Sequence, residues 1–331
     1  MDQAPTRQDT LGSRPAAETP LSGAVVDQLV RHRGSVLAIY LVLSVGGVAT
    51  IGPPDRPAVL WWLVGFIVVT CAGSEAGFRR FLIDWVPVLV IAAGYDTVRA
   101  ESVDLLSRAI VHPQLRFDEV VFGGTAPTVT LQRWLNAGQG VHWWDYVAWL
   151  GYLSHFVVTL AFAAFFYVVD RERFHRLAML VVTVSVAGFI TYFIIPAVPP
   201  WLASRQGVLP HTTRIEYEVW SHLGVPAVAK VFNGSAQLAN PVAALPSLHA
   251  AWPLLVLLFI WPTARRGRWV FLGYLVFMMA VLVYGAEHYV SDILLGWAYA
   301  LVVFWAWNRH WAHRDRSSHG APAGGLVTRP G

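Results

Sequence analysis

The sequence predicts an all-α, polytopic membrane protein with about eight transmembrane helices. Three observations lead to this fold class. First, 56% of the 331 residues are hydrophobic and only 13% are charged, about half the charged fraction of a soluble globular protein. Second, the chain contains repeated apolar runs long enough to cross a bilayer. Third, arginine clusters lie between alternate runs. The composition excludes a disordered, a fibrous or an ordinary soluble chain.

Eight apolar runs are candidate spans, and a turn rich in Gly and Pro at 52–57 separates the first two. Their approximate ranges are 35–51, 58–77, 82–98, 144–169, 177–195, 246–262, 269–285 and 290–308. The flanking segments 1–34 and 309–331 are polar and lack an apolar core. We therefore expect a transmembrane domain at 35–308 between two disordered cytoplasmic tails. The N-terminal segment has no pattern of a cleaved signal peptide.

Basic residues fall into five clusters, before the first span and after the second, fourth, sixth and eighth. The clusters are at 31–33, 79–80, 171–176, 265–268 and 309–316. Because arginine is enriched in cytoplasmic loops, this pattern predicts a multi-pass cell-membrane protein with both termini in the cytoplasm. The long loops 99–143 and 196–245 then face outward. The net charge of +4 is spread over these clusters, so we expect no nucleic-acid partner.

Two segments at predicted outer helix ends carry residue types suited to chemistry. The segment 245–251 contains His249, and the segment 284–292 contains His288 and Asp292. The two histidines are 39 positions apart, which is one helix inward, a short turn and one helix outward, so both return to the outer face. Asp292 lies four residues after His288, hence on the same helix face. A carboxylate there fixes the imidazole tautomer and leaves the other ring nitrogen as nucleophile or base.

Ser247 is suited to cap the helix that begins beside it, and a helix N-terminus binds phosphate well. A helix over 247–261 would be about 22 Å long at 1.5 Å per residue, shorter than a bilayer core of about 30 Å. We therefore expect His249 to be recessed in a cavity that a lipid headgroup can reach. Two histidines and an aspartate could alternatively form a metal-binding facial triad. Since the helix N-terminus and Ser247 favour an anion, we predict no metal and no cofactor. The single Cys71 permits neither an intrachain disulfide nor a cysteine metal site.

At these residues the chain resembles the type 2 phosphatidic acid phosphatase superfamily. Residues 246–249, Pro-Ser-Leu-His, resemble its second signature, and His-Tyr-Val-Ser-Asp at 288–292 resembles its third. Leu248 and the Glu-His-Tyr context resemble the inositol phosphorylceramide synthase branch, the inositolphosphotransferases. Further segments resemble bacterial members of that branch, at 84–87, 95–99, 122–127, 152–156 and 196–201.

The resemblance implies a six-helix phosphatase-like core and a two-step phosphoryl or phosphodiester transfer. In such a reaction, His288, held by Asp292, attacks the phosphorus of a phospholipid or polyprenyl-phosphate headgroup in the outer leaflet, while His249 protonates the leaving oxygen. Water or an acceptor alcohol then resolves the phosphohistidine, so the chain would be a phosphatase or a transferase. The alternative is a transporter or carrier with buried histidines.

The chain departs from the superfamily pattern in its cations. No Lys-x6-Arg-Pro element is present, and Leu282 stands where the third signature has an arginine. The phosphate still needs positive charge. The candidates in the outer segments are Arg99, Arg205, Arg214 and Lys230, of which we favour Arg99 and Arg205.

Two further polar residues are predicted to support the substrate or its selectivity. Asp96 either pairs with Arg99, three residues later, or takes a headgroup hydroxyl. His155 lies about 16 Å along its helix from the outer end. We expect it to be too deep to reach a phosphate at the mouth, unless the cavity is deep.

Overall fold

The computed structural model describes residues 39, 43, 75–136, 140–224 and 240–319. The predicted tail 1–34 lies outside these residues, as do nearly all of the predicted spans 35–51 and 58–77. The chain divides into two compact units, Met1–Ile83 and Asp84–Gly331. Everything described below concerns the second unit, apart from the start of helix α4.

The described part of the chain is all-α, which confirms the predicted fold class. Six long or apolar helices correspond to the predicted spans from 82–98 onward: α4 Glu75–Ala100, α8 Trp143–Val169, α9 Arg171–Ile194, α13 Leu248–Ile260, α14 Gly267–Tyr284 and α15 Val290–His319. Five short helices occupy the predicted outer loops: α5 Ser102–Leu106, α6 His112–Val121, α7 Pro127–Leu135, α10 Pro200–Arg205 and α11 Ile215–His222. The only β-structure among the described residues is two isolated bridges that join Ile110, Ala197 and Ala243.

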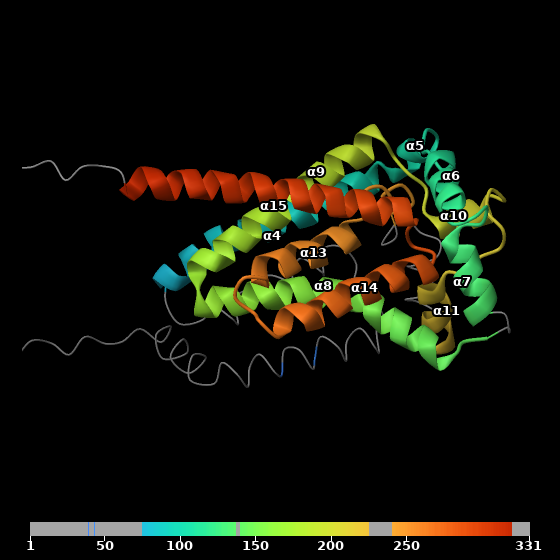
Figure 1. Ribbon diagram of the computed structural model, residues 1–331, viewed down its shortest axis with the longest axis horizontal. Helices are drawn as coiled ribbons and strands as arrows, with labels where there is room; N and C mark the ends of the chain where they lie inside the picture. The colour runs from blue at the N-terminus through green and yellow to red at the C-terminus, as the bar shows by residue number, and fades with distance from the viewer. Residues whose placement is uncertain (1–38, 40–42, 44–74, 137–139, 225–239, 320–331) are drawn as a thin grey trace, which may run out of the picture. The chain divides into compact units, whose positions relative to one another are not determined.

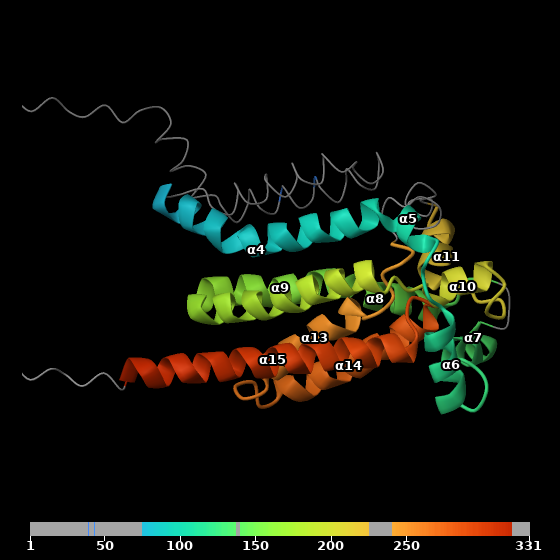
Figure 2. The same ribbon diagram turned by 90° about the horizontal axis from the view of Figure 1, so that it is seen from above.

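The long helices lie alongside one another, and the short helices gather at one end of the bundle (Figures 1 and 2). By length and composition, α9, α14 and Val290–Arg314 of α15 are each able to cross a membrane. The two arms of α8, which meet at 40°, form a fourth span if they are taken together. Helix α13 is apolar but has only 13 residues, in agreement with the short helix expected over 247–261.

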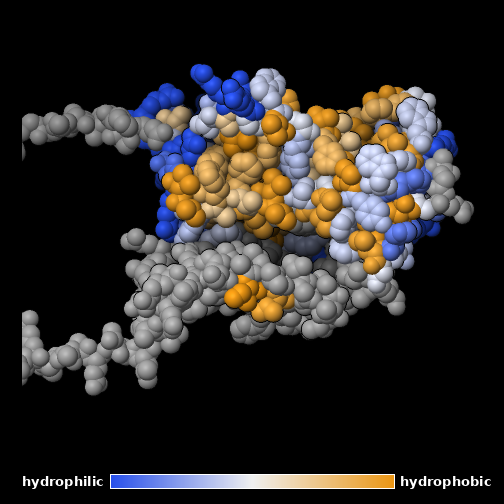
Figure 3. All heavy atoms as spheres, turned by 90° about the horizontal axis from the view of Figure 1, so that it is seen from below, coloured by the Kyte–Doolittle hydropathy of each residue, from blue (hydrophilic) through white to orange (hydrophobic). Residues whose placement is uncertain are grey.

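The surface of the bundle is apolar where lipid would face it. Side chains such as Leu160, Val168, Val270 and Val302 are largely exposed on the long helices. The face in Figure 3 accordingly shows a band of hydrophobic side chains between hydrophilic ends. This distribution is the reverse of that on a soluble protein and fits a hydrocarbon solvent.

The C-terminal helix extends beyond the predicted end of its span at 308. Residues 309–319, expected to belong to a disordered tail, continue α15 as far as His319, and residues 320–331 are outside the described part. Aromatic packing explains the extension. The ring of Trp311 lies 5.4 Å from that of Trp307, and the guanidinium of Arg176 on α9 lies 5.2 Å over it.

The two ends of the bundle differ in charge. The arginine clusters at 171–176, 265–268 and 309–316 lie at the α8–α9 connection, the α13–α14 connection and the end of α15, away from the short helices. The segments that contain His249 and His288 begin α13 and α15 at the opposite end. These three arginine clusters, which follow alternate spans in the sequence, therefore lie at one end of the bundle, and the histidine segments lie at the other.

Helices α13 and α15 make the most extensive contact among the described helices. Gly296 allows their close approach, since a Cβ at this position would overlap the carbonyl oxygen of Ser247. The backbone N–H of Ser247 also donates to the carbonyl oxygen of Asp292 (2.9 Å). The beginnings of the two helices are thus joined directly, backbone to backbone.

Candidate active site

The structure brings the two predicted histidines together. Nδ1 of His249 and Nε2 of His288 are 3.1 Å apart, and the ring centroids are separated by 5.3 Å. His288 is buried, whereas His249 is half-buried. The return of both segments to one end of the bundle, predicted from their 39-residue spacing, is therefore seen in the structure.

The surroundings of His288 fix its tautomer. Its Nδ1 lies 2.9 Å from the carbonyl oxygen of Ala244, and a carbonyl can only accept, so Nδ1 must carry the proton. Nε2 therefore presents a lone pair towards His249, whose Nδ1 is the donor of the contact between the rings. Oδ2 of Asp292 lies 3.7 Å from Nδ1 of His288 and accepts the backbone N–H of Tyr289 at 2.9 Å. Asp292 thus adds negative charge on the Nδ1 side, while the Ala244 carbonyl makes the shorter contact.

Ser247 is the N-cap of α13, as predicted. Its side-chain oxygen accepts the backbone N–H of Ala250 (3.3 Å). The backbone N–H groups of the first helical turn point towards the end of α13 that carries His249, and the helix dipole makes this end positive. An anion beside the two histidines would be stabilised by the same helix end.

His155 lies next to this pair, which corrects the expectation that it is too deep. Its ring centroid is 4.5 Å from that of His249, and it stacks on Trp252 at 4.9 Å. Tyr152, one turn earlier on α8, lies 5.2 Å from His249. The estimated depth placed the site at the mouth, but α13 is short and begins inside the bundle, so His249 is at the level of His155.

A strained turn carries His288 between α14 and α15. Ala286 has φ 60°, a left-handed conformation that costs an alanine about 1–2 kcal/mol. The backbone N–H of Trp201 donates to the carbonyl oxygen of Ala286 (2.9 Å), which helps to hold this conformation. Gly285 precedes it, and a Cβ there would lie 2.5 Å from Oε1 of Glu216 and 3.0 Å from the carbonyl oxygen of Val281. A side chain at position 285 would therefore require the Glu216 carboxyl group to move.

Arg214 and Glu287 form a buried ion pair beside the nucleophile candidate. Nε and Nη2 of Arg214 donate to Oε1 and Oε2 of Glu287 at 2.5 and 3.1 Å, and both side chains are less than a tenth exposed. Burial opposes the charge of Arg214, but the adjacent Glu287 outweighs it and raises the pKa of the guanidinium. The Arg214 charge is close enough to act electrostatically on His249 and Tyr152. Arg214 is therefore a permanent cation close to the histidines.

Glu216 completes this cluster as a second, fully buried carboxyl group. Burial first and the charge of Glu287 second raise its pKa well above the usual range, against the lowering effect of Arg214. Burial and the neighbouring carboxylate thus favour the protonated form of Glu216. One arginine, one carboxylate and one carboxylic acid then lie together behind His288, and their formal charges cancel.

The other predicted substrate-binding residues lie in different surroundings. Arg99 is buried at the end of α4, whereas Arg205 is exposed at the end of α10, over the ring of Trp201 at 5.0 Å. Asp96 is on α4, but its side chain is outside the described part, and so is Lys230. Sequence reasoning ranked Arg214 behind Arg99 and Arg205. The signal that would have raised it is Glu287, a carboxylate directly before His288 that needs a cation if buried.

Asp118 on α6 fixes the start of α15 and was not anticipated. Its Oδ2 and Oδ1 accept the backbone N–H groups of Val290 and Ser291 at 3.0 and 3.1 Å. The side chain is fully buried, and burial raises its pKa from 3.8 to about 6. Asp118 thus acts as a distant cap of the helix that carries Asp292.

The arrangement is suited to bind and cleave a phosphate ester. It offers a lone pair on His288, a proton on His249, a positive helix end and a buried arginine. Within the described residues no cluster of three or more His, Cys, Asp or Glu side chains has the geometry to hold a metal ion.

Comparisons with known proteins show the family to which the chain belongs. The sequence profile described as the PAP2 superfamily matches residues 123–306, which include His249, His288 and Asp292. Phosphoinositol dihydroceramide synthase of Bacteroides thetaiotaomicron is 30% identical over 283 residues, which make up 81% of this chain and 87% of the relative. Inositol phosphorylceramide synthase catalytic subunit aur1 of Schizosaccharomyces pombe is 29% identical over 123 residues, 35% of this chain and 28% of the relative. No solved structure matches the chain.

Proposed function

This chain belongs to the PAP2 superfamily and is a membrane-bound lipid phosphotransferase or phosphatase; from that premise, we propose that it transfers a phosphorylated headgroup through a phosphohistidine on His288. The observation that carries the proposal is the 3.1 Å approach of His249 Nδ1 to a His288 Nε2 whose tautomer the Ala244 carbonyl fixes. His288 as nucleophile and His249 as proton donor then face the same small space. Displacement of a leaving group at phosphorus requires both close to the same phosphate.

In the first step, the Nε2 lone pair of His288 forms a bond to phosphorus, and the bond from phosphorus to the leaving lipid oxygen breaks. His249 enters this step as an imidazolium ion, gives that oxygen a proton and becomes neutral. In the second step, an acceptor oxygen attacks phosphorus, its proton passes to His249, and the bond between phosphorus and nitrogen breaks. Asp292 and the Ala244 carbonyl stabilise His288 while it carries positive charge. Arg214 and the N-terminal end of α13 offset the charge that develops on the phosphoryl oxygens.

The acceptor distinguishes a transferase from a phosphatase. The names of the two relatives point to an inositol phospholipid as donor and to the hydroxyl of a ceramide-type lipid as acceptor. We therefore propose an inositolphosphotransferase, with hydrolysis by water as the competing reaction. The test is purified protein given a labelled inositol phospholipid, with and without a ceramide acceptor, in the presence of a chelator. Labelled phosphorylated lipid supports the transferase, and release of free headgroup alone supports the phosphatase. No product from any lipid phosphate would reject both and favour the transporter alternative.

We further propose that the site opens to the outer leaflet, with both termini in the cytoplasm. This follows from the arginine clusters at the opposite end of the bundle. Cys71 is replaced by serine, and single cysteines are introduced at exposed His211 and at exposed Arg266. An impermeant thiol reagent should label the cysteine at 211 in intact cells and the one at 266 only after lysis. The reverse result would invert the topology.

A further inference from the structure

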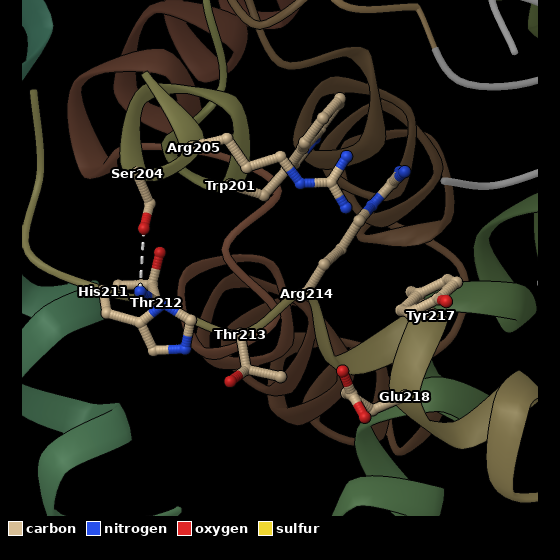
Figure 4. Close-up of a pocket in the computed structure, with 9 residues that line it drawn as sticks. All are labelled: Trp201, Ser204, Arg205, His211, Thr212, Thr213, Arg214, Tyr217 and Glu218. Carbon is tan, nitrogen blue, oxygen red and sulfur yellow. Dashed lines mark hydrogen bonds between the residues drawn. The ribbon is translucent and has the colours of Figure 1, made fainter. Parts of the chain in front are cut away.

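A polar cavity of about 160 Å³ opens between α10 and α11 at the end of the bundle that carries the histidines (Figure 4). Its wall includes buried Trp201, Thr212 and Arg214 and exposed Arg205 and Glu218. Neither histidine of the pair lines it. The volume is below the roughly 300 Å³ of the smallest drug-sized pockets, so the cavity suits a small polar group and not an acyl chain.

Two cations converge on this cavity. The guanidinium groups of Arg205 and Arg214 lie 5.0 and 4.5 Å from the ring centroid of Trp201, and Figure 4 shows both side chains reaching towards that tryptophan. Their like charges repel, and burial together with the charge of Arg214 lowers the pKa of Arg205. An anion between them would relieve this repulsion.

One hydroxyl group on the wall lacks a partner. Thr212 is only 6% exposed, and its backbone N–H donates to the side-chain oxygen of Ser204 (2.9 Å). Its own Oγ1 has no hydrogen-bond partner among the described residues. A buried hydroxyl without a partner is costly. Ser204, Thr213 and Tyr217 bring further hydrogen-bonding groups to the wall of the cavity.

The cavity is fastened to the turn that carries His288. Besides the bond from Trp201 to the Ala286 carbonyl, the side-chain N–H groups of Gln132 donate to the carbonyl oxygens of Thr213 and Tyr284, both at 2.7 Å. Oε1 of Gln132 accepts the backbone N–H of Thr213 (2.7 Å). Arg214 itself bridges the cavity and Glu287. A group bound in the cavity is therefore held at a fixed position relative to the nucleophile.

We propose that this cavity binds the hydroxyl-rich part of a polyol-phosphate headgroup, with the phosphate on the Arg214 side. The ring hydroxyls of such a headgroup would pair with Thr212, Tyr217, the Glu218 carboxylate and the Arg205 guanidinium, and the phosphate would contact Arg214. The inference rests on the proposed function, because it assigns the headgroup specificity of that reaction to the α10–α11 cavity.

The first test compares two substrates in Arg205→Gln and in the matched control Arg133→Gln, an exposed arginine on α7. One substrate is an inositol phospholipid and the other is nitrophenyl phosphate, which lacks the polyol. Arg205→Gln should raise the KM for the inositol phospholipid, relative to the KM for nitrophenyl phosphate, about ten- to a hundredfold. This is the size expected for loss of a hydrogen bond to a charged group. The control should leave the ratio unchanged. An equal effect of Arg205→Gln on both substrates, or none, overturns the proposal.

The second test uses Thr212→Val, which removes the orphan hydroxyl at nearly constant volume. Free inositol phosphate should raise the Tm of the wild-type protein more than inorganic phosphate does, and Thr212→Val should abolish the difference. A variant that is merely more stable, with the same ligand response, overturns the proposal. This binding measurement requires no turnover. If the wild-type protein proves inactive but its Tm still rises more with inositol phosphate than with inorganic phosphate, the proposed function is rejected and the headgroup-binding cavity is supported.

Discussion

Gly296 is the position at which one added methyl group should most disturb the two-histidine site. It lies on α15 one turn after Asp292, and a Cβ there would overlap the carbonyl oxygen of Ser247 while lying 3.1 Å from its carbonyl carbon and 3.3 Å from its nitrogen. These are backbone atoms of the residue that caps α13, two positions before His249. No side chain can therefore rotate away to make room.

The size of the effect follows from this geometry. Non-bonded heavy atoms settle at about 3.5 Å, so the two helix ends must separate by roughly 1 Å. Overpacking of this kind lowers stability by about 1–3 kcal/mol, and a misplacement of about 1 Å costs about 100-fold in rate. Because His249 and His288 belong to the two elements that separate, we expect Gly296→Ala to lower kcat about 100-fold, with a smaller change in KM.

The assay is headgroup transfer by protein purified in detergent, with folding checked by gel filtration and Tm. The matched control is Gly273→Ala on α14, an exposed glycine whose Cβ would meet nothing within 4 Å. The control should be as active as wild type. A folded Gly296→Ala protein whose kcat stays within a few-fold of wild type would refute the reasoning, since the site would then tolerate separation of its two helices.

Three further predictions concern the residues around the nucleophile. His288→Ala should abolish product formation and Asp292→Asn should lower kcat by several orders of magnitude; substantial residual turnover in either would point to another nucleophile. Glu216→Gln should keep activity and Tm near wild type, because a protonated acid and an amide are both neutral, whereas Glu216→Ala should lower the Tm by opening a cavity beside Gly285; equal damage by both would show that Glu216 is ionised. Burial raises the pKa of Asp118 from 3.8 to about 6, so the folded protein favours the protonated carboxyl group. The stability that Asp118 contributes is therefore full below about pH 4 and is lost as the pH rises through 6. Thermal unfolding between pH 4 and 7 should therefore have a flatter pH profile in Asp118→Asn, and an unchanged slope would contradict this assignment.

Much of the fold was predictable because lipid imposes a simple rule on sequence. Apolar runs at 144–169, 177–195, 269–285 and 290–308 became helices, since a backbone in hydrocarbon must satisfy its hydrogen bonds internally. The end of α15 was not predictable from hydropathy. It depends on a cation–π contact between Arg176 and Trp311, residues from different helices.

The histidine pair was predictable for a different reason. His288 and Asp292 are related by helical spacing, and the resemblance to the superfamily, now confirmed, joins them to His249. Arg214, Glu216 and Asp118 belong to segments outside the long helices. Their positions depend on contacts with the turn between α14 and α15 and with the start of α15, which lie far along the chain. No periodicity records such contacts, so a loop arginine looked like a solvated charge.

The turn at 285–289 explains why the catalytic candidates and the unforeseen cluster belong to one structure. Gly285 leaves space for the Glu216 carboxyl group, Ala286 adopts φ 60°, Glu287 pairs with Arg214, and His288 follows. Each of these four residues contacts the segment between α9 and α13. The partners, in the same order, are Glu216, Trp201, Arg214 and Ala244. A protein without the Lys-x6-Arg-Pro element must bring a cation to the phosphate from elsewhere, and a carboxylate next to the nucleophile is an effective way to position one. The buried ion pair costs desolvation, and the raised pKa of Glu216 favours a form in which the second carboxyl group adds no charge. If the proposed function holds, we expect the buried Glu216–Arg214–Glu287 cluster to supply the cation that the absent Lys-x6-Arg-Pro element would otherwise provide.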